Sequence, residues 1–375
     1  MGSKPVRAAL VMEQTLGHVT HATNLAAAVA EQDVIRATWL PVPFDVAGAE
    51  RLVPGFNSNW SIRASWRARR ALGKAVAARP HDALLFHTQV TALFSVGLMR
   101  RYPSIVSLDA TPFNYDSVGL AYGHAPAGDG LLDRHKFQLN RRVFQAAVRV
   151  VAWSDWARRS LIEDYGVDPA RIVVLAPGAA PAYFELGQHR MQGGEHPVAS
   201  PVRLLFVGGD FERKGGTVLL EALGGELGER CELHVVTQAP VEPRPNVHVH
   251  RGLAPNSAEL RRLFAEADVF VLPSRGECLA IALMEATAAG LPVVTTAIGA
   301  LPEAVLPDVS GLVVPADDAA ALRAAVAVLV ADPARRVRMG RAGHRLAHAR
   351  FNAQRNNRYL LGLLAESGST DRRTA

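Results

Sequence analysis

Two glutamates, Glu277 and Glu285, are separated by seven residues in a stretch that runs from a buried strand into a helix. The apolar run Val269–Leu272 predicts the strand, and the pattern of Leu279–Ala289 predicts the helix after a short glycine-containing loop. At ~3.6 residues per turn, Glu285 lies about a turn and a half into that helix. Free N–H groups at a helix N-terminus favour a diphosphate, and a nearby carboxylate can accept hydrogen bonds from vicinal hydroxyls. The pattern therefore indicates a site for a phosphorylated, hydroxyl-rich ligand, the alternative being an ordinary helix with an exposed acidic residue.

A second segment with possible chemistry follows the strand predicted at Val202–Val207. It carries a glycine pair, Gly208 and Gly209, and then the cations Arg213 and Lys214 just before another predicted helix. The glycines permit close approach of the backbone to a ligand, and the two cations can neutralise a diphosphate that leaves as an anion. The alternative is an ordinary solvated turn.

The spacing of Glu277 and Glu285, followed by Ala and then by Gly-Leu-Pro-Val-Val, resembles the E-x7-E motif of glycosyltransferase family 4. These are retaining enzymes of GT-B architecture. The resemblance implies that Glu277 contacts the donor sugar and that Glu285 binds the ribose. The family often has Gly-Phe-Gly after the first glutamate, whereas this chain has Cys278, Leu279 and Ala280. The backbone N–H groups of these residues are expected to contact the donor sugar. Ala280 makes the site narrower than the family's glycine would.

The glycine pair with Arg213 and Lys214 looks like the family's G-x-n-R-K-G element, which places both cations on the donor diphosphate. The reaction implied is transfer of a hexose-type sugar from a nucleoside-diphosphate sugar to an acceptor hydroxyl, in glycan biosynthesis. Attack is expected on the face that the leaving group departs from, with the leaving phosphate taking the acceptor proton. Neither a cofactor nor a metal ion is expected, since the sequence has no D-x-D motif. The alternatives are a nucleotide-sugar epimerase of the same fold and a non-catalytic nucleotide-sugar binding protein.

The N-terminal half carries fewer signals. Gly17 and His18 lie in the turn between the first strand and a helix predicted over Thr20–Glu31. The family places a glycine near the donor phosphate at this point, so Gly17 is a donor-binding candidate and His18 an acceptor candidate. Members commonly have a donor-contacting His after the strand predicted here at Ile105–Leu108, and this chain has Asp109 instead. An ionised Asp accepts hydrogen bonds from a sugar hydroxyl but donates none, and its alternative role is an Asx turn. His87 is a second acceptor candidate.

Short apolar runs alternate with helix-length segments throughout the chain, which predicts parallel α/β sheets. Besides the runs named above, the first half contains Val6–Met12, Ala83–Phe86, Val148–Trp153 and Ile172–Leu175, and the second half contains Glu232–Val236, Val247–His250, Pro292–Thr295 and Gly311–Val314. The expected fold is GT-B, with two doubly wound Rossmann-like domains facing a central cleft. We expect an acceptor-binding domain over residues 1–186, a linker over 187–201 and a nucleotide-sugar-binding domain over 202–351. The remainder, 352–375, is expected to form a helix that packs back on the N-terminal domain, and to be disordered from residue 366.

Composition narrows the class further. The 375 residues include 41 basic and 35 acidic ones, a formal net charge of +6, and only two cysteines. No apolar run is long enough to span a bilayer, no signal peptide is recognised, and no zinc or RNA-binding motif occurs, which favours a cytoplasmic protein and no nucleic acid partner. No G-x-G-x-x-G follows a strand, which argues against a dinucleotide oxidoreductase. The expected partners are a nucleotide sugar and an acceptor that is a small molecule, a glycan or a lipid.

One basic segment, Trp60–Arg79, contains interleaved tryptophans. In a helix, Arg63, Arg67, Arg70 and Lys74 would lie on one side. This permits a peripheral contact with the inner face of a membrane through residues 60–79. The alternative is a solvated helix that packs its tryptophans inward.

Overall fold

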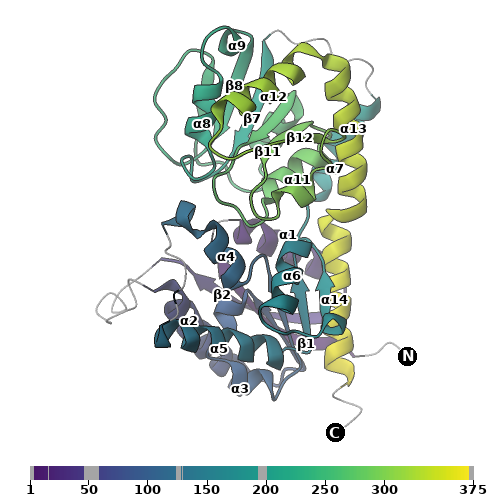
Figure 1. Ribbon diagram of the computed structural model, residues 1–375. Coiled ribbons are helices and arrows are strands. Elements are labelled where there is room, and N and C mark those ends of the chain that lie inside the picture. Colours follow the sequence, from purple (N-terminus) through teal and green to yellow (C-terminus); the bar gives the residue numbers. More distant parts are fainter. Residues whose placement is uncertain are drawn as a thin grey trace. The chain divides into compact units, whose positions relative to one another are not determined.

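The computed structural model describes residues 4–15, 17–45, 59–123, 128, 130–192 and 201–370. The chain divides into two compact units, which are residues 1–113, 127–176 and 354–375, and residues 114–126 and 177–353 (Figure 1).

The first unit is built on a six-stranded parallel sheet with the strand order β2-β1-β3-β4-β5-β6. Its strands are β1 (Val6–Gln14), β2 (Ile35–Pro43), β3 (Ala83–His87), β4 (Ser104–Leu108), β5 (Arg149–Ala152) and β6 (Ile172–Val174). Five of them coincide with the apolar runs found in the sequence. The exception is β2, where polar residues and two prolines interrupt the apolar pattern. Its position at the edge explains this, because an edge strand tolerates proline and is buried on less of its surface.

Helices cover both faces of this sheet. They are α1 (His18–Ala30), α2 (Trp60–Ala78), α3 (Val96–Met99), the first residues of α4 (Pro112–Val118), α5 (Leu131–Ala146), α6 (Asp155–Glu163) and α14 (Ala353–Thr370, yellow in Figure 1). Buried residues of α2, α5 and α6, among them Leu72, Phe144 and Leu161, share one hydrophobic cluster. Leu25 of α1 and Leu364 of α14 belong to the cluster on the other face. The last helix is therefore part of the N-terminal unit.

The second unit contains another six-stranded parallel sheet, with the order β12-β11-β10-β7-β8-β9. Its strands are β7 (Val202–Val207), β8 (Cys231–Val236), β9 (Val247–His250), β10 (Val269–Leu272), β11 (Val293–Thr296) and β12 (Gly311–Val314). Its helices are α7 (Pro181–Gln192), α8 (Gly216–Ala222), α9 (Glu226–Glu229), α10 (Ala258–Glu266), α11 (Ile281–Ala288), α12 (Ala319–Ala331) and α13 (Pro333–Arg350). In such a sheet all strands end at one edge, so the loops after β7 and β10 lie close together.

Residues 114–126 and 177–186, predicted to lie in the first domain, belong to the second unit. Two further boundaries differ from the prediction. Residues 187–192, predicted as the start of a linker, are the end of α7, while residues 193–200 lie outside the described residues. Gly187 belongs to a packed helix because a Cβ there would lie 2.3 Å from the Ala288 carbonyl oxygen and 2.2 Å from His344. The second difference is the tail: residues 366–370, predicted to be disordered, continue α14.

Among the described residues, no helix is both long and apolar enough to cross a membrane.

Candidate functional site

The loops after β7 and β10 bring together three charged residues that the sequence singled out. The Arg213 guanidinium, only 5% exposed, donates from Nη1 to the Gly276 carbonyl oxygen at 2.7 Å and from Nε to Asp210 at 3.1 Å. Its Nη1 also lies 3.8 Å from the Glu277 carboxylate, and the ammonium of Lys214 contacts the same carboxylate directly. Two cations and one acid thus form a compact cluster at the carboxyl edge of the sheet.

Burial alone would lower the pKa of Arg213. Glu277, Tyr122 and Asp210 outweigh that effect and raise this pKa above its ordinary value, so the guanidinium stays charged. A fixed positive charge with little solvent around it is suited to a phosphate, because the interaction is weakly screened there.

The two glycines of the β7 loop have different surroundings. Gly208 is buried, and a Cβ there would lie 2.9 Å from Cγ of Lys214. Its small size therefore makes room for the lysine side chain. Gly209 is exposed, and no neighbour would lie within 4 Å of a Cβ placed on it. Of the pair, only Gly209 leaves open space beside the backbone.

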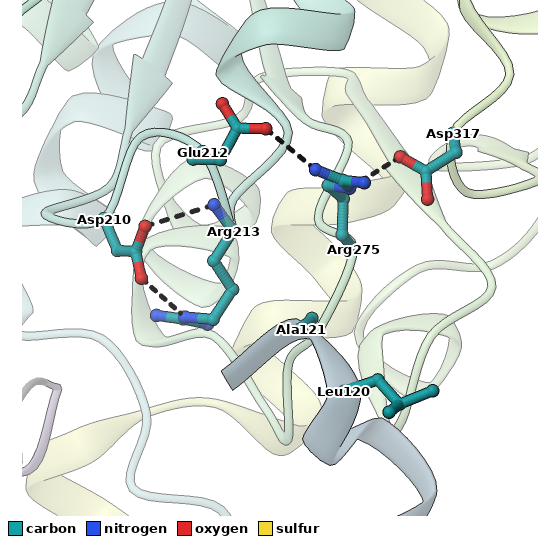
Figure 2. Close-up of a pocket in the computed structure, with 7 residues that line it drawn as sticks. All are labelled: Leu120, Ala121, Asp210, Glu212, Arg213, Arg275 and Asp317. Carbon is teal, nitrogen blue, oxygen red and sulfur yellow. Dashed lines mark hydrogen bonds and ion pairs between the residues drawn. The ribbon is translucent and has the colours of Figure 1, made fainter. Parts of the chain in front are cut away.

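A pocket of about 380 Å³ adjoins this cluster (Figure 2). Its lining residues are Leu120, Ala121, Asp210, Glu212, Arg213, Arg275 and Asp317. Arg275 is held between two carboxylates, with distances of 2.8 Å to Glu212 and 2.7 Å to Asp317. Arg213 and Arg275 are thus the two cations in the pocket lining, and two carboxylates already neutralise Arg275.

One side of this cluster comes from a segment that carried no sequence signal. The 3-10 turn Gly119–Tyr122 belongs to the second unit, and the ring centroid of Tyr122 lies 4.2 Å from Cζ of Arg213. The neighbouring Ala121 packs so closely that a Cβ on Gly276 would lie 2.5 Å from its methyl group. Only the folded structure reveals these two contacts, since nothing in the local sequence marks the turn.

The residues after Glu277 lead directly into α11. Cys278, Leu279 and Ala280 are all buried, and Ala280 has extended backbone just before the helix begins at Ile281. The helix starts two residues later than the sequence predicted. Its first N–H groups therefore follow the Glu277 loop.

Glu285 lies on α11 and is 4% exposed. Burial raises the pKa of Glu285 to about 8, and an interaction with the hydroxyl of Tyr183 on α7 acts in the opposite sense. Burial and the nearby Glu285 together raise the pKa of Tyr183. Glu285 is therefore mostly protonated at neutral pH, with Tyr183 as a neighbour that the sequence did not indicate.

The first unit has its own polar cluster at the carboxyl edge of its sheet. His18, the first residue of α1, places Nε2 3.4 Å from the carboxylate of Asp109, which follows β4. Burial acts to raise the pKa of Asp109, but His18 and the backbone N–H groups of Asp109 and Ala110 outweigh it and lower that pKa. Asp109 is therefore ionised beside the imidazole. Gly17 stands just before the helix and is exposed.

Around this pair, three further rings pack together. His87, the last residue of β3, lies 4.7 Å from His18, 4.9 Å from His21 and 5.3 Å from Trp153, measured between ring centroids. Burial lowers the pKa of His87 well below its ordinary value and that of His21 to about 3. Both rings are therefore neutral. The sequence identified His18 and His87 as candidates but missed His21 and Trp153.

Glu13 is a buried acid that the sequence did not suggest. Its carboxylate accepts hydrogen bonds from Thr88 at 2.6 Å, Thr15 at 2.7 Å and the Trp60 indole at 3.2 Å. Three donors hold the carboxylate, so Glu13 ties the end of β1 to its surroundings.

Within the described parts of the chain, no group of three or more His, Cys, Asp or Glu is arranged to hold a metal ion.

The predicted basic row on α2 is only partly present. Arg63 is buried and donates to the Phe44 carbonyl oxygen, and Arg67 donates to the carbonyl oxygens of Pro43 and Asp45. These two cations are therefore engaged by carbonyl oxygens at the end of β2 and just after it. Arg70 and Lys74 are exposed.

Comparison with known families covers most of both units. Residues 16–182 match glycosyltransferase family 4, and residues 201–332 match the glycosyl transferases group 1. The D-inositol 3-phosphate glycosyltransferase of Kineococcus radiotolerans is 33% identical over 262 residues, covering 62% of this chain and 59% of the relative. That of Geodermatophilus obscurus is 37% identical over 214 residues, covering 50% and 47%. The chain thus matches about half to three fifths of the length of these relatives.

Solved structures agree over nearly the whole chain. Sucrose-phosphate synthase from Thermosynechococcus elongatus superimposes with a TM-score of 0.72 at 17% identity, covering 97% of this chain and 100% of that one. HepE from Anabaena, solved in complex with UDP and glucose, gives a TM-score of 0.67 at 14% identity, covering 96% and 99%. These likenesses show the fold, which is GT-B with a parallel α/β sheet in each domain.

Proposed function

The chain belongs to glycosyltransferase family 4, and from this premise we propose that it transfers a sugar from a nucleoside-diphosphate sugar to an acceptor hydroxyl with retention of configuration. The sugar is of the hexose type. The observation that carries this proposal is the cluster of Arg213, Lys214 and Glu277 beside the start of α11. It combines two cations for a diphosphate with one carboxylate for a sugar.

In the proposed reaction, the bond between the anomeric carbon and the diphosphate oxygen breaks as nucleoside diphosphate departs. Arg213 and Lys214 stabilise the negative charge that develops on the leaving group. The acceptor oxygen forms the new bond to the anomeric carbon on the same face. Its proton passes to the leaving phosphate oxygen, so atoms and charges balance without a covalent enzyme intermediate.

Glu277 is proposed to orient the sugar. Donor binding has to draw Lys214 away from Glu277 toward the diphosphate, and the released carboxylate can then accept hydrogen bonds from sugar hydroxyls. Glu285 is proposed to accept the ribose hydroxyls. The backbone N–H groups of Cys278, Leu279 and Ala280 are proposed as further donor contacts.

The polar cluster of the first unit is proposed to bind and orient the acceptor. His18 and Asp109 offer a donor and an acceptor of hydrogen bonds 3.4 Å apart, which suits a hydroxyl that must be held in one orientation. The relatives named above make an inositol phosphate the first acceptor to assay.

The test begins with thermal unfolding in a panel of nucleoside diphosphates and nucleotide sugars. The proposal requires that at least one nucleotide sugar raises the melting temperature and, when incubated alone, slowly releases nucleoside diphosphate. If none of the nucleotides raises the melting temperature, the proposal is wrong, because a ligand that binds the folded state must stabilise that state.

The same panel separates the alternatives. An epimerase would isomerise the donor sugar without an acceptor, and a non-catalytic binder would be stabilised without releasing nucleoside diphosphate. Glu277→Gln should lower turnover roughly 100-fold. Glu229→Gln, at an exposed position of α9, serves as the matched control and should leave turnover unchanged.

We also propose a peripheral contact with anionic membrane surfaces through the outer side of α2. The exposed Arg69, Arg70 and Lys74 lie on the same helix as Ile62 and Trp66, which are 40% and 39% exposed. Cations beside exposed apolar side chains are the pattern of a helix that lies at a bilayer interface.

A further inference from the structure

We infer that Tyr122 is a positioning residue for the donor diphosphate, acting by holding the guanidinium of Arg213. The inference rests on the proposed function, since it assumes that Arg213 binds a phosphate. It goes beyond that function because it assigns a role to the turn Gly119–Tyr122, which lies in the N-terminal half of the sequence and belongs to the second unit.

The guanidinium of Arg213 is held by the ring of Tyr122 and by two hydrogen bonds. The ring centroid lies 4.2 Å from Cζ, well within the ~6 Å that a cation–π interaction requires. The bond from Nε to Asp210 and the bond from Nη1 to the Gly276 carbonyl oxygen hold two of its edges. A ring contact and two hydrogen bonds thereby restrain the group.

This arrangement leaves hydrogen-bonding capacity for a ligand. A guanidinium has five N–H donors, and an aromatic ring near its Cζ supplies no oxygen or nitrogen acceptor to any of them. Among the described residues, hydrogen bonds from the guanidinium engage only Nε and Nη1. Arg213 also lines the pocket of Figure 2, so it adjoins a space that a ligand can enter. A phosphate can therefore bind the remaining donors of a preoriented group.

The turn itself is held against the site by close packing. The methyl group of Ala121 would lie 2.5 Å from a Cβ on Gly276, so the two segments approach closely only because that residue is glycine. The ring centroids of Tyr115 and Tyr122 are 4.9 Å apart, so Tyr115 packs against Tyr122. These contacts give Tyr122 a defined place beside Arg213.

The chemistry of tyrosine fits this role better than a second carboxylate would. An acid in place of the ring would also hold Arg213, but its charge would repel the diphosphate. The ring attracts the cation through its quadrupole and adds no net charge. Tyr122 therefore restrains Arg213 without competing for the ligand's charge.

The experiment compares Tyr122→Phe with Tyr122→Leu in the full-length protein. Titration calorimetry measures the affinity of each variant for the nucleoside diphosphate that best stabilises the wild type, and for the nucleoside of the same base. Tyr122→Phe keeps the ring and should bind both ligands as the wild type does. Tyr122→Leu keeps bulk but has no aromatic face, and should bind the diphosphate roughly 5-fold to 30-fold more weakly.

The nucleoside supplies the control. It lacks the phosphates that Arg213 would contact, so its affinity should be unchanged in Tyr122→Leu, and a variant that merely folds badly would lose both ligands. Equal diphosphate affinity of Tyr122→Leu and wild type would overturn the inference, as would tighter binding, which would make Tyr122 an obstruction. If no nucleoside diphosphate binds the wild type, the proposed function fails instead, and the two failures are distinct.

Discussion

Lys214 and Glu277 form a direct ion pair in the second unit, with the ammonium on the carboxylate that Arg213 also faces at 3.8 Å. The pair joins the loop after β7 to the loop after β10. It means that the residue proposed to orient the sugar also holds the cations proposed to bind the diphosphate. Binding and chemistry should therefore respond differently when Glu277 is changed.

Glu277→Gln should separate the two. The neutral amide no longer holds Lys214, so a nucleoside diphosphate should bind at least as tightly as to the wild type. Transfer should fall roughly 100-fold, the size of effect expected when a reacting group is misplaced. Calorimetry and initial rates measure the two quantities on the same preparation. Weaker nucleotide binding together with unchanged transfer would contradict the proposed division of roles.

Glu285 predicts proton release on donor binding. Its pKa of about 8 leaves about nine tenths of the carboxyl groups protonated at pH 7. Hydrogen bonds from ribose hydroxyls favour the ionised form and lower that pKa, so binding should release a proton. Calorimetry at pH 7 in buffers of different ionisation enthalpy should give different heats. Above pH 9 the heats should converge, because Glu285 is already ionised.

The control for this prediction is Glu285→Gln, which should bind the donor with equal heats in all buffers. The variant also has a stability consequence. The folded pKa is raised from 4.5, so the contribution of Glu285 to stability is fully present below pH 4.5 and is lost as pH rises through 8. At pH 8 the glutamine variant should therefore be more stable than the wild type, on the order of 1 kcal/mol or more, in chemical denaturation. Equal stability at that pH would contradict the assigned shift.

The sequence predicted the sheets well where the strands are continuous apolar runs. The bounds of the central strands β7 and β10 match the prediction because parallel strands covered on both faces need apolar residues throughout. The convergence of Arg213 with Glu277 also followed from sequence, since loops after parallel strands share one edge. By contrast, β2 was not recognised, because an edge position removes the need for such a run.

The neighbours of the site were harder to predict. Tyr122 reaches Arg213 through tertiary packing alone, and no local pattern marks it. His21 was missed because the helix was predicted to begin at Thr20, which left His18 in a turn. In the structure α1 begins at His18, so His18 and His21 stand three residues apart on one helix face. Because the start of this helix was predicted two residues too late, the cluster that contains His18 and His21 was not predicted.

The pair of His18 and Asp109 should act as a unit on the acceptor. His18→Gln and Asp109→Asn each remove one member, and the double variant removes both. The loss in kcat/KM for the acceptor should be smaller for the double variant than the sum of the single losses, with a coupling of about 1 kcal/mol or more. Donor affinity should stay unchanged in all three. Strictly additive losses would show that the two residues act independently.

Neutral, buried histidines make the first unit sensitive to acid. His21 and His87 have pKa values lowered below 6.5 in the folded state, so their contribution to stability is present above pH 6.5 and is lost as pH falls toward the folded values. Each contributes a slope of up to about 1.4 kcal/mol per pH unit below that point. His87→Leu removes one such slope and should flatten the fall in stability between pH 6.5 and pH 5.

The same substitution should stabilise the protein at pH 7.5 by about 1 kcal/mol. Both ring nitrogens of His87 are buried without a hydrogen-bond partner among the described residues, and leucine has no polar atom to satisfy. Urea denaturation at the two pH values measures both effects. The control is His135→Leu, at an exposed position of α5, which should change neither. A steeper acid dependence in the His87 variant would reverse the assigned direction of the shift.

The outer side of α2 predicts a dependence of membrane binding on lipid charge. Arg70 and Lys74 are exposed one helical turn apart, and each cation near an anionic surface contributes about 1 kcal/mol. Arg70→Gln with Lys74→Gln should therefore weaken binding to vesicles of phosphatidylcholine and phosphatidylglycerol roughly 30-fold in a sedimentation assay. Arg341→Gln with Arg345→Gln makes the same change of charge at the same spacing on α13 and should leave binding unchanged. Equal losses in both double variants would show that net charge alone drives the association, and binding to vesicles of phosphatidylcholine alone would show that charge is not needed.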